Sequence, residues 1–237
     1  ALMINNIDEA NKNYWQNYKA GEIPSVHNNI PSEIFEGTTG PILDVGTGDG
    51  ILAENLAQKG FDVYGIDIAK NIINENISKN TKVKYSIQDI TTKTNFPDDF
   101  FEFIIFKFTL TNIHKDSWEK VGNEIFRILN KNGKLLIIEP LVSESYNSRY
   151  NLASSFIKDK NCLYVFKDKD LAKNISSKED LKNALDKNQV SRIIKHYTFE
   201  EINDIFKKLK LMNCRTLVIP SPSGYDINTF EGIFKKI

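Results

Sequence analysis

The chain has 237 residues, of which 41% are hydrophobic and 26% are charged, with 31 basic and 31 acidic side chains. This size and composition are typical of one α/β domain with a sizeable core. The balanced charge disfavours a nucleic-acid partner, because phosphate binding usually requires a basic surface.

Cysteine usage and hydropathy exclude further classes of protein. Cys162 and Cys214 belong to no metal-ligand or Cys-x-x-Cys spacing, so we expect free thiols and no metal site. No apolar run approaches the ~20 residues that span a bilayer, and no signal-peptide pattern precedes the globular pattern. We therefore expect a cytoplasmic protein with no membrane partner.

A helix is predicted from Ile4 to about Lys19, with Tyr14, Trp15 and Tyr18 on one aromatic face. This face could pack on the surface of the domain or cover a bound ligand, and the pattern alone leaves both interpretations open.

A strand, a tight turn and a helix are predicted next. The strand Ile42–Val45 leads into glycines at alternate positions from 46 to 50, and a helical pattern follows as far as Lys59 and Gly60. Glycines let a ligand approach backbone N–H groups at a helix N-terminus, although such turns also occur without a ligand. Asp44, inside the strand, is the more specific feature, because it suits a ligand that carries an ammonium group.

The second predicted strand, Asp62–Asp67, completes a right-handed parallel βαβ unit. Asp67 at its end could accept hydrogen bonds from ribose hydroxyls or cap the next helix, and the two roles are compatible. That helix is predicted over residues 69–79, and its three isoleucines are expected to face the sheet: Ile72, Ile73 and Ile77.

The third strand, Val83–Ile87, is expected near the sheet edge, and Asp89 follows it. The fourth, Phe101–Phe106, is a nearly continuous apolar run, which predicts a strand buried on both faces. Residues 107–114 then fall at the carboxyl edge of the sheet, where ligands bind in open α/β folds. His114 in this segment is a candidate base, and a structural role is an equal alternative.

Residues Asp116–Glu119 resemble a capping box that opens a helix, which residues 130–133 are expected to close before a fifth strand, Lys134–Glu139. The segment 141–197 is too long for an ordinary connection, so a structured insertion is expected. It contains two short helical patterns, Tyr150–Lys158 and Lys178–Lys187. A solvated surface excursion or a dimer contact would account for it.

A second capping box, Thr198–Glu201, opens the next predicted helix, whose apolar face includes Ile202 and Ile205. Two strands, Asn213–Ile219 and Phe230–Ile237, are then joined by a short turn. They are therefore expected to form an antiparallel hairpin.

The motif Asp44-x-Gly46-x-Gly48-x-Gly50 resembles the first motif of the class I S-adenosylmethionine-dependent methyltransferases. The Arg-x-Leu-x-x-x-Gly pattern of residues 127–133 is also similar to this family. The resemblance covers residues 35–140 by motif and 198–237 by pattern. It implies a Rossmann-like seven-stranded, mostly parallel sheet with helices on both faces and a C-terminal antiparallel hairpin. We expect one domain over residues 1–237, with an N-terminal lid segment 1–35 and an acceptor-side insertion 141–197.

The resemblance further implies S-adenosylmethionine as cofactor, with Asp67 at the ribose and Asp89 at the adenine, although Asp89 could also be an ordinary turn residue. The full set of implied cofactor-binding residues is Asp44, Gly46, Thr47, Gly48, Gly50, Asp67, Ile68, Asp89, Ile90 and Lys107. The acceptor pocket is expected to include Tyr14, Trp15, Tyr18, His114 and Tyr146.

These features favour O-, N- or S-methylation of a small molecule. No Asn/Asp-Pro-Pro-aromatic motif follows the fourth strand, which disfavours enzymes that methylate adenine or glutamine amino groups. A nicotinamide-dependent oxidoreductase is disfavoured by Asp44 and by the terminal hairpin. An RNA methyltransferase that uses the lysines of residues 158–195, and a cofactor-binding module without activity, stay as alternatives. The acceptor and the oligomeric state are not determined by the sequence.

Overall fold

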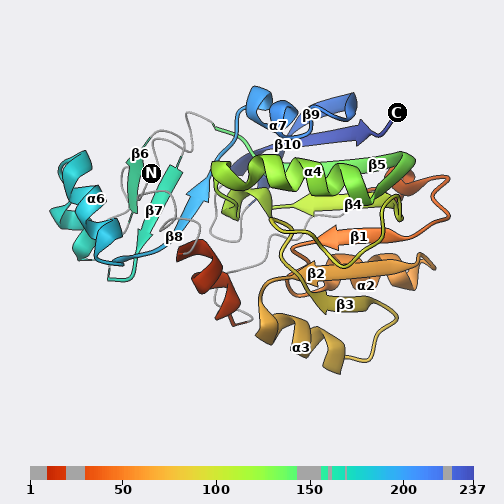
Figure 1. Ribbon diagram of the computed structural model, residues 1–237, viewed down its shortest axis with the longest axis horizontal. Helices are drawn as coiled ribbons and strands as arrows, with labels where there is room; N and C mark the ends of the chain where they lie inside the picture. Colours follow the sequence, from red (N-terminus) through yellow and green to blue (C-terminus); the bar gives the residue numbers. More distant parts are fainter. Residues whose placement is uncertain (1–9, 20–29, 143–155, 160–161, 169, 221–225) are drawn as a thin grey trace.

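The computed structural model describes residues 10–19, 30–142, 156–159, 162–168, 170–220 and 226–237. Its main element is a seven-stranded sheet in the order β3-β2-β1-β4-β5-β10-β9 (Figure 1). The five strands from β3 to β5 are parallel, and β10 runs antiparallel to both β5 and β9. The Rossmann-like sheet and its C-terminal antiparallel hairpin are therefore confirmed.

The strands of this sheet are β1 Ile42–Val45, β2 Val63–Asp67, β3 Lys84–Ile87, β4 Phe101–Lys107, β5 Leu129–Pro140, β9 Lys210–Pro220 and β10 Asp226–Lys235. The α-helices are α2 Ile51–Gln58, α3 Lys70–Ser78, α4 Trp118–Ile128, α6 Lys178–Asp186 and α7 Phe199–Ile205, and residues 10–16 are also helical. Short 3-10 turns are η1 Ser32–Phe35, η2 Leu110–Asn112, η3 Lys115–Ser117 and η4 Leu171–Asn174.

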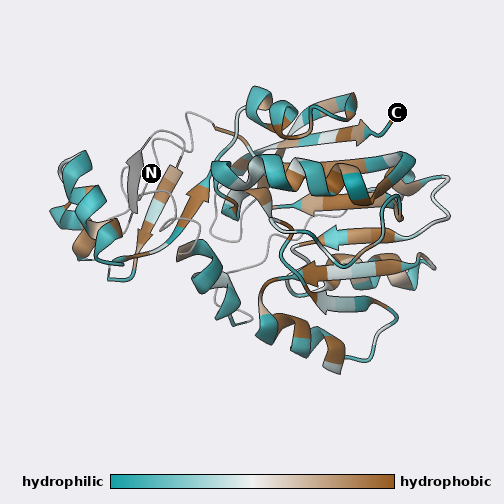
Figure 2. Ribbon diagram, viewed as in Figure 1, coloured by the Kyte–Doolittle hydropathy of each residue, from teal (hydrophilic) through white to brown (hydrophobic). Residues whose placement is uncertain are grey.

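Strand β4 is buried on both faces, as its largely apolar sequence predicts. Figure 2 shows the hydrophobic residues along this strand. Ile104 and Phe106 pack into one core cluster with α4 and α7, whereas Phe103 and Ile105 pack into a second cluster with α2 and η1. The helices thus cover both faces of the sheet, which leaves its carboxyl edge as the place where the parallel strands end together.

The region around α4 differs from the sequence prediction at both ends. The 3-10 turn η3 precedes the helix, and the N-cap residue Ser117 makes no side-chain capping bond, so the predicted capping box at Asp116–Glu119 is absent. At the other end, α4 passes directly into β5, and residues 130–133 are strand. The reason is pairing with the C-terminal segment, where Asn132 N donates to Lys236 O and Lys236 N donates to Gly133 O, each at 3.0 Å.

Helix α3 buries Ile72 and Ile73, but Ile77 is 54% exposed, so its predicted place against the sheet is wrong. Asn76 is buried in its stead, at 1% exposure. This polar residue completes the i, i+3, i+4 stripe of the helix because it bonds to the loop after β1, as described below.

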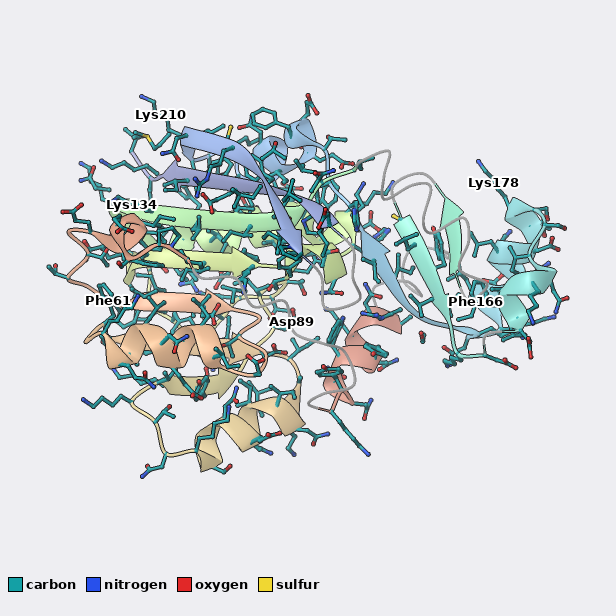
Figure 3. The ribbon with its side chains drawn as sticks, turned by 180° about the vertical axis from the view of Figure 1, so that it is seen from behind. Phe61, Asp89, Lys134, Phe166, Lys178 and Lys210 are labelled. Atoms are coloured by element: carbon teal, nitrogen blue, oxygen red, sulfur yellow. The ribbon has the colours of Figure 1, made fainter. Side chains whose placement is uncertain are left out.

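The segment of sequence between β5 and α7 forms a second sheet. It consists of β6 Phe156–Asp159, β7 Cys162–Phe166 and β8 Val190–Lys195 in antiparallel order, with α6 packed on it through an apolar cluster that includes Phe166 and Leu181. Figure 3 shows Phe166 and Lys178 at the opposite end of the molecule from Phe61 and Lys134.

Two helical patterns were predicted for this segment, and one is confirmed as α6. The other, Tyr150–Lys158, is wrong where it can be compared: residues 156–158 belong to β6, because they pair with β7, and residues 150–155 lie outside the described part of the chain. The capping box at the start of α7 is confirmed, with Glu201 N donating to Thr198 Oγ1 at 3.2 Å and Thr198 N donating to Glu201 Oε2 at 3.0 Å.

The contact between α4 and α7 yields a stability prediction. A Cβ atom added to Gly122 would overlap the backbone carbonyl of Ile205. Gly122→Ala should therefore lower the free energy of unfolding by about 1–3 kcal/mol, as overpacking does. The sign of this change distinguishes the two cases, because Gly→Ala in an open helix interior raises the free energy of unfolding by about 1 kcal/mol.

Urea unfolding measures this difference, and Asn123→Ala, at an exposed position of the same helix, is the matched control. A Gly122→Ala protein as stable as Asn123→Ala would contradict the close approach of the two helices.

Candidate functional site

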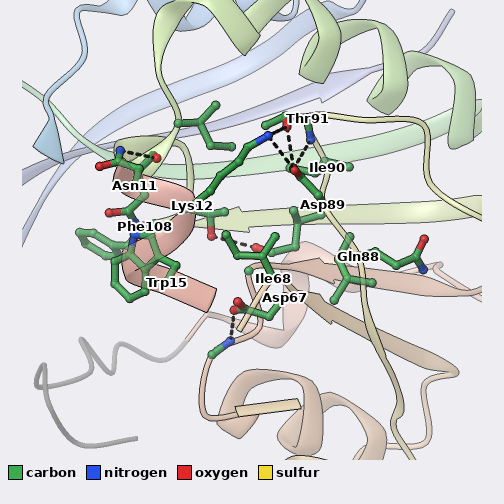
Figure 4. A pocket seen from close by; sticks show the side chains of 17 residues that line it. Asn11, Lys12, Trp15, Asp67, Ile68, Gln88, Asp89, Ile90, Thr91 and Phe108 are labelled. Carbon is green, nitrogen blue, oxygen red and sulfur yellow. Dashed lines mark hydrogen bonds and ion pairs between the residues drawn. The ribbon is translucent and has the colours of Figure 1, made fainter. Parts of the chain in front are cut away.

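A pocket opens at the carboxyl edge of the main sheet, underneath the helix formed by residues 10–16 (Figure 4). It encloses about 780 Å³, including the part that is open to solvent. Five segments line it: the loop after β1, the end of β2, the segment after β3, the turn after β4, and the N-terminal helix. The lining residues used below are Asn11, Lys12, Trp15, Gly46, Gly48, Asp67, Ile68, Asp89, Ile90, Phe108, Thr109 and Asn112.

The three glycines of the loop after β1 serve different purposes. A Cβ atom on Gly46 would overlap the side chain of Thr109, and one on Gly50 would overlap the hydroxyl of Tyr85. A Cβ atom on Gly48 would meet only a backbone oxygen, 4.0 Å away. Gly46 and Gly48 line the pocket, whereas Gly50 is the N-cap of α2 in a left-handed conformation and does not. The loop therefore exposes bare backbone to the pocket at two of the three positions.

Asp44 lies beneath this loop and is 3% exposed. Burial raises the pKa of Asp44 to about 6, although the hydrogen bond from Thr47 Oγ1, at 2.8 Å, and the charge of Lys107 act in the opposite direction. Burial also lowers the pKa of Lys107. The structure thus brings Asp44, Thr47 and Lys107 together below the pocket, not on its lining.

Asp67 joins the loop after β1 to the start of α3. Its carboxylate accepts a hydrogen bond from Gly48 N at 3.1 Å and another from Ala69 N at 2.9 Å. Burial raises the pKa of Asp67, whereas these bonds lower it. Asn76 holds the same loop from the other side, since Asn76 Nδ2 donates to Gly48 O at 2.8 Å. The sequence analysis missed Asn76; a polar residue on the buried stripe of a helix was the available signal.

Asp89 lies on the pocket wall next to Ile90, and Ile68 follows Asp67 (Figure 4). Asp89 Oδ1 accepts bonds from Thr91 N at 2.9 Å and Thr91 Oγ1 at 2.7 Å, and Lys12 Nζ lies 2.9 Å from Asp89 Oδ2. Burial acts to raise the pKa of Asp89, but these partners outweigh it and hold the pKa below its usual value. Lys12 was also missed.

Only some of the predicted acceptor residues reach the pocket. Trp15 lines it, whereas Tyr14 and Tyr18 pack against the Trp15 ring with centroids 5.1 Å away in each case. His114 is outside the lining, 3.4 Å from Asp116 Oδ2, and serves as the N-cap of η3. Tyr146 lies outside the described residues.

Glu139, at the end of β5, anchors the turn after β4 and was not identified from the sequence. It is fully buried and accepts hydrogen bonds from the backbone N–H groups of Thr109 at 2.7 Å, Leu110 at 2.8 Å and Thr111 at 3.2 Å. Burial raises the pKa of Glu139 to about 8, although these three bonds lower it. The carboxyl group therefore holds the turn whose residues line one side of the pocket.

The described residues contain no group of three or more His, Cys, Asp or Glu side chains that could hold a metal ion. No helix in the same part of the chain is both long and apolar enough to cross a membrane.

The buried Glu139 predicts a pH dependence of stability. Because its pKa is raised on folding from 4.5 to about 8, its contribution to stability is fully present below pH 4.5 and is lost as the pH rises through about 8. Glu139→Gln cannot ionise, so its stability relative to wild type should increase over this range, by up to about 1.4 kcal/mol per pH unit.

Denaturant unfolding at several pH values measures the effect, with Glu119→Gln, at an exposed position, as control. A constant difference between wild type and Glu139→Gln from pH 4.5 to 8 would rule out the raised pKa.

Known proteins resemble this chain over parts of its length. A phosphoethanolamine N-methyltransferase from Plasmodium falciparum is 30% identical over 122 residues, which are 50% of this chain and 46% of that protein. A ubiquinone biosynthesis O-methyltransferase from Hydrogenovibrio crunogenus is 33% identical over 96 residues, 35% of this chain and 38% of that protein. The matched region thus spans less than half the length of each of these relatives.

Solved structures share the fold at low sequence identity. A protein from Methanosarcina mazei described as a SAM-dependent methyltransferase superposes with a TM-score of 0.69 at 20% identity, covering 89% of this chain and 99% of that one. A 1,6-didemethyltoxoflavin-N1-methyltransferase from Burkholderia thailandensis, with S-adenosylhomocysteine bound, has a TM-score of 0.58 at 13% identity, covering 86% and 76%.

A family model described as a methyltransferase domain matches residues 19–211, which include the whole parallel part of the sheet and its carboxyl edge. The chain therefore belongs to the methyltransferase domain family, within the class I S-adenosylmethionine-dependent methyltransferases.

Proposed function

We propose that this chain transfers a methyl group from S-adenosylmethionine to an O, N or S atom of a small-molecule acceptor. The observation that carries the proposal is one pocket that joins the bare backbone of Gly46 and Gly48 to the carboxylates of Asp67 and Asp89. A ligand with an amino-acid part, a ribose and an adenine needs three such features in succession.

The residues present fit this cofactor, which supplies a methyl group already activated by a sulfonium charge. Gly48 has space where a side chain would stand, so its backbone can approach the amino-acid part. Asp44 lies below and provides negative charge for the ammonium group, with Thr47 and Lys107 around it. Asp67 is assigned to the ribose hydroxyls and Asp89 to the adenine amino group, and Ile68 and Ile90 beside them provide apolar contact.

The helix 10–16 covers the pocket, and this supports the proposal that the acceptor is a small molecule. Asn11, Lys12 and Trp15 of the helix 10–16 lie on its wall, and Phe108 and Asn112 line the turn after β4. Such an arrangement can exclude water and hold an acceptor atom ~3 Å from the reacting methyl group, which is worth about 7–11 kcal/mol in favourable cases. The names of the relatives are consistent with this, since phosphoethanolamine is a small molecule.

We extend the proposal to the domain organisation and to His114. Residues 1–35 are proposed as a lid segment and residues 141–197 as an acceptor-side insertion of one domain, which we expect to be cytoplasmic. The helix 10–16 and the insertion strand β8 both reach the carboxyl edge of the sheet (Figure 1). His114 is retained only as a candidate base, since its contacts with Asp116 support a structural role.

Asp67→Ala tests the assignment of the ribose site. Loss of a carboxylate that bonds ribose hydroxyls should weaken S-adenosylhomocysteine binding by about 10- to 150-fold, the range for hydrogen bonds to charged groups. Isothermal titration calorimetry measures the affinity.

Asp62→Ala, on the exposed side of the same strand region, is the matched control and should bind as wild type. Wild-type affinity in Asp67→Ala would contradict the assignment, and saturable binding of NADH in place of S-adenosylhomocysteine would favour an oxidoreductase.

The raised pKa of Asp44 leads us to expect that the affinity for S-adenosylhomocysteine depends on pH. Its pKa of about 6 means that the attracting carboxylate is present above pH 6 and is progressively protonated below it. Affinity for S-adenosylhomocysteine should then fall by up to about tenfold per pH unit below 6, and Asp44→Asn should bind weakly without this slope. Titrations from pH 5 to 8 measure it, with Asp226→Asn as an exposed control. The same slope in Asp44→Asn would assign the titration to another group.

A further inference from the structure

Asn11 makes a buried junction between three segments that are distant in the sequence. Its side chain is on the helix 10–16, and the residue is 3% exposed. Asn11 Nδ2 donates to Asn112 O at 2.8 Å and to Ile193 O at 3.1 Å, and Asn11 Oδ1 accepts from Ile193 N at 2.6 Å. One carboxamide therefore connects the N-terminal helix, the turn η2 and the strand β8 of the insertion.

Each of these segments has a distinct place relative to the pocket. The helix 10–16 covers the pocket, and Lys12, the next residue, pairs with Asp89 on the cofactor side. The turn η2 contributes Asn112 to the lining. Strand β8 contributes no residue to the lining, but it lies against η2, where Thr111 Oγ1 donates to Lys195 O at 2.7 Å.

The chemistry of the junction requires an amide. The two acceptors of Asn11 are carbonyl oxygens, and the third partner is a backbone N–H group, so the side chain must both donate and accept. A carboxylate of the same shape would face two carbonyl oxygens, and an apolar side chain would leave three buried backbone groups without a partner. Water cannot replace these bonds easily, because the junction is buried.

We propose that Asn11 is a positioning residue for methyl transfer, which fastens β8 and η2 to the helix over the cofactor pocket so that a bound cofactor orders the acceptor side. This rests on the proposed function, namely that the pocket binds S-adenosylmethionine. Lys12 connects the helix to the cofactor side through Asp89, and Asn11 connects it to the insertion. When the helix 10–16 is in place over the pocket, it therefore fixes both the cofactor side, through Asp89, and the acceptor side, through η2 and β8.

Hydrogen exchange of the full chain, with and without saturating S-adenosylhomocysteine, tests the coupling. The backbone N–H of Ile193 donates directly to Asn11 and is the reporter. In wild type, the ligand should slow its exchange about tenfold, although β8 does not line the pocket. Asn11→Asp and Asn11→Ala should abolish this slowing, whereas Asn13→Ala, at an exposed position on the same helix, should retain it.

A pH series separates a hydrogen-bonding role from simple packing. In Asn11→Asp, the introduced carboxyl group can donate one bond when protonated, so slowing at Ile193 should partly return as the pH falls. In Asn11→Ala, it should stay absent at every pH. Equal behaviour of the two variants across the series would overturn the assignment of the carboxamide as the connection.

Failure of the coupling and failure of the proposed function give different results. A wild-type protein that does not bind S-adenosylhomocysteine in calorimetry refutes the proposed function. Binding with undiminished slowing at Ile193 in Asn11→Asp and Asn11→Ala refutes the coupling alone. Amides of β4 report global folding in every variant.

If both Asn11 variants unfold, Lys12→Met decides the matter. It keeps the carboxamide junction and removes the ion pair with Asp89. In Lys12→Met, saturating S-adenosylhomocysteine should slow hydrogen exchange at the Ile193 N–H less than it does in wild type. The same slowing of exchange as in wild type would overturn the proposal.

Discussion

The hydrogen bond from Gly48 N to the carboxylate of Asp67 is the interaction on which the pocket depends. It fixes the glycine-rich loop at the end of β1 to the end of β2, and Asn76 of α3 fixes the same loop by donating to the carbonyl oxygen of Gly48. The parallel pairing of β1 with β2 and β4 brings these strand ends to one edge. The bare backbone is therefore held open to a ligand by two side chains that hydrogen-bond to it on either side.

The opposite side of the pocket is formed by the turn after β4, which buried side chains hold in place. The pairing of β4 with β5 ends at Phe108, whose N–H donates to Ile138 O at 2.9 Å and whose conformation is left-handed, with φ of 54°. Three backbone N–H groups of the turn are satisfied by Glu139, and the hydroxyl of Tyr197 donates to Leu110 O at 2.5 Å. Buried polar side chains thus replace the bonds that a strand would have made, and they make the turn a rigid wall.

Patterns in the sequence predicted the central part of the fold because each is local. The apolar run of β4 requires burial on both faces, and the short stretch of sequence between β9 and β10 requires an antiparallel hairpin. The predictions from sequence were wrong where contacts between residues distant in the sequence outweighed the local pattern. Residues 130–133 have the composition of a turn, yet their bonds to Lys236 make them strand, and Ile77 is exposed because Asn76 is needed inside.

The sequence by itself determined the sheet class, the glycine loop, and the positions of Asp67 and Asp89 at the ends of successive strands. These follow from spacing along the chain, since parallel strands end at one edge. Only the tertiary structure decided that Lys12 pairs with Asp89, that Asn11 joins β8 to η2, and that Glu139 holds the turn after β4. Asn11 is separated from Ile193 by 182 positions, and the chemistry of a single amide does not specify which backbone groups folding will bring to it.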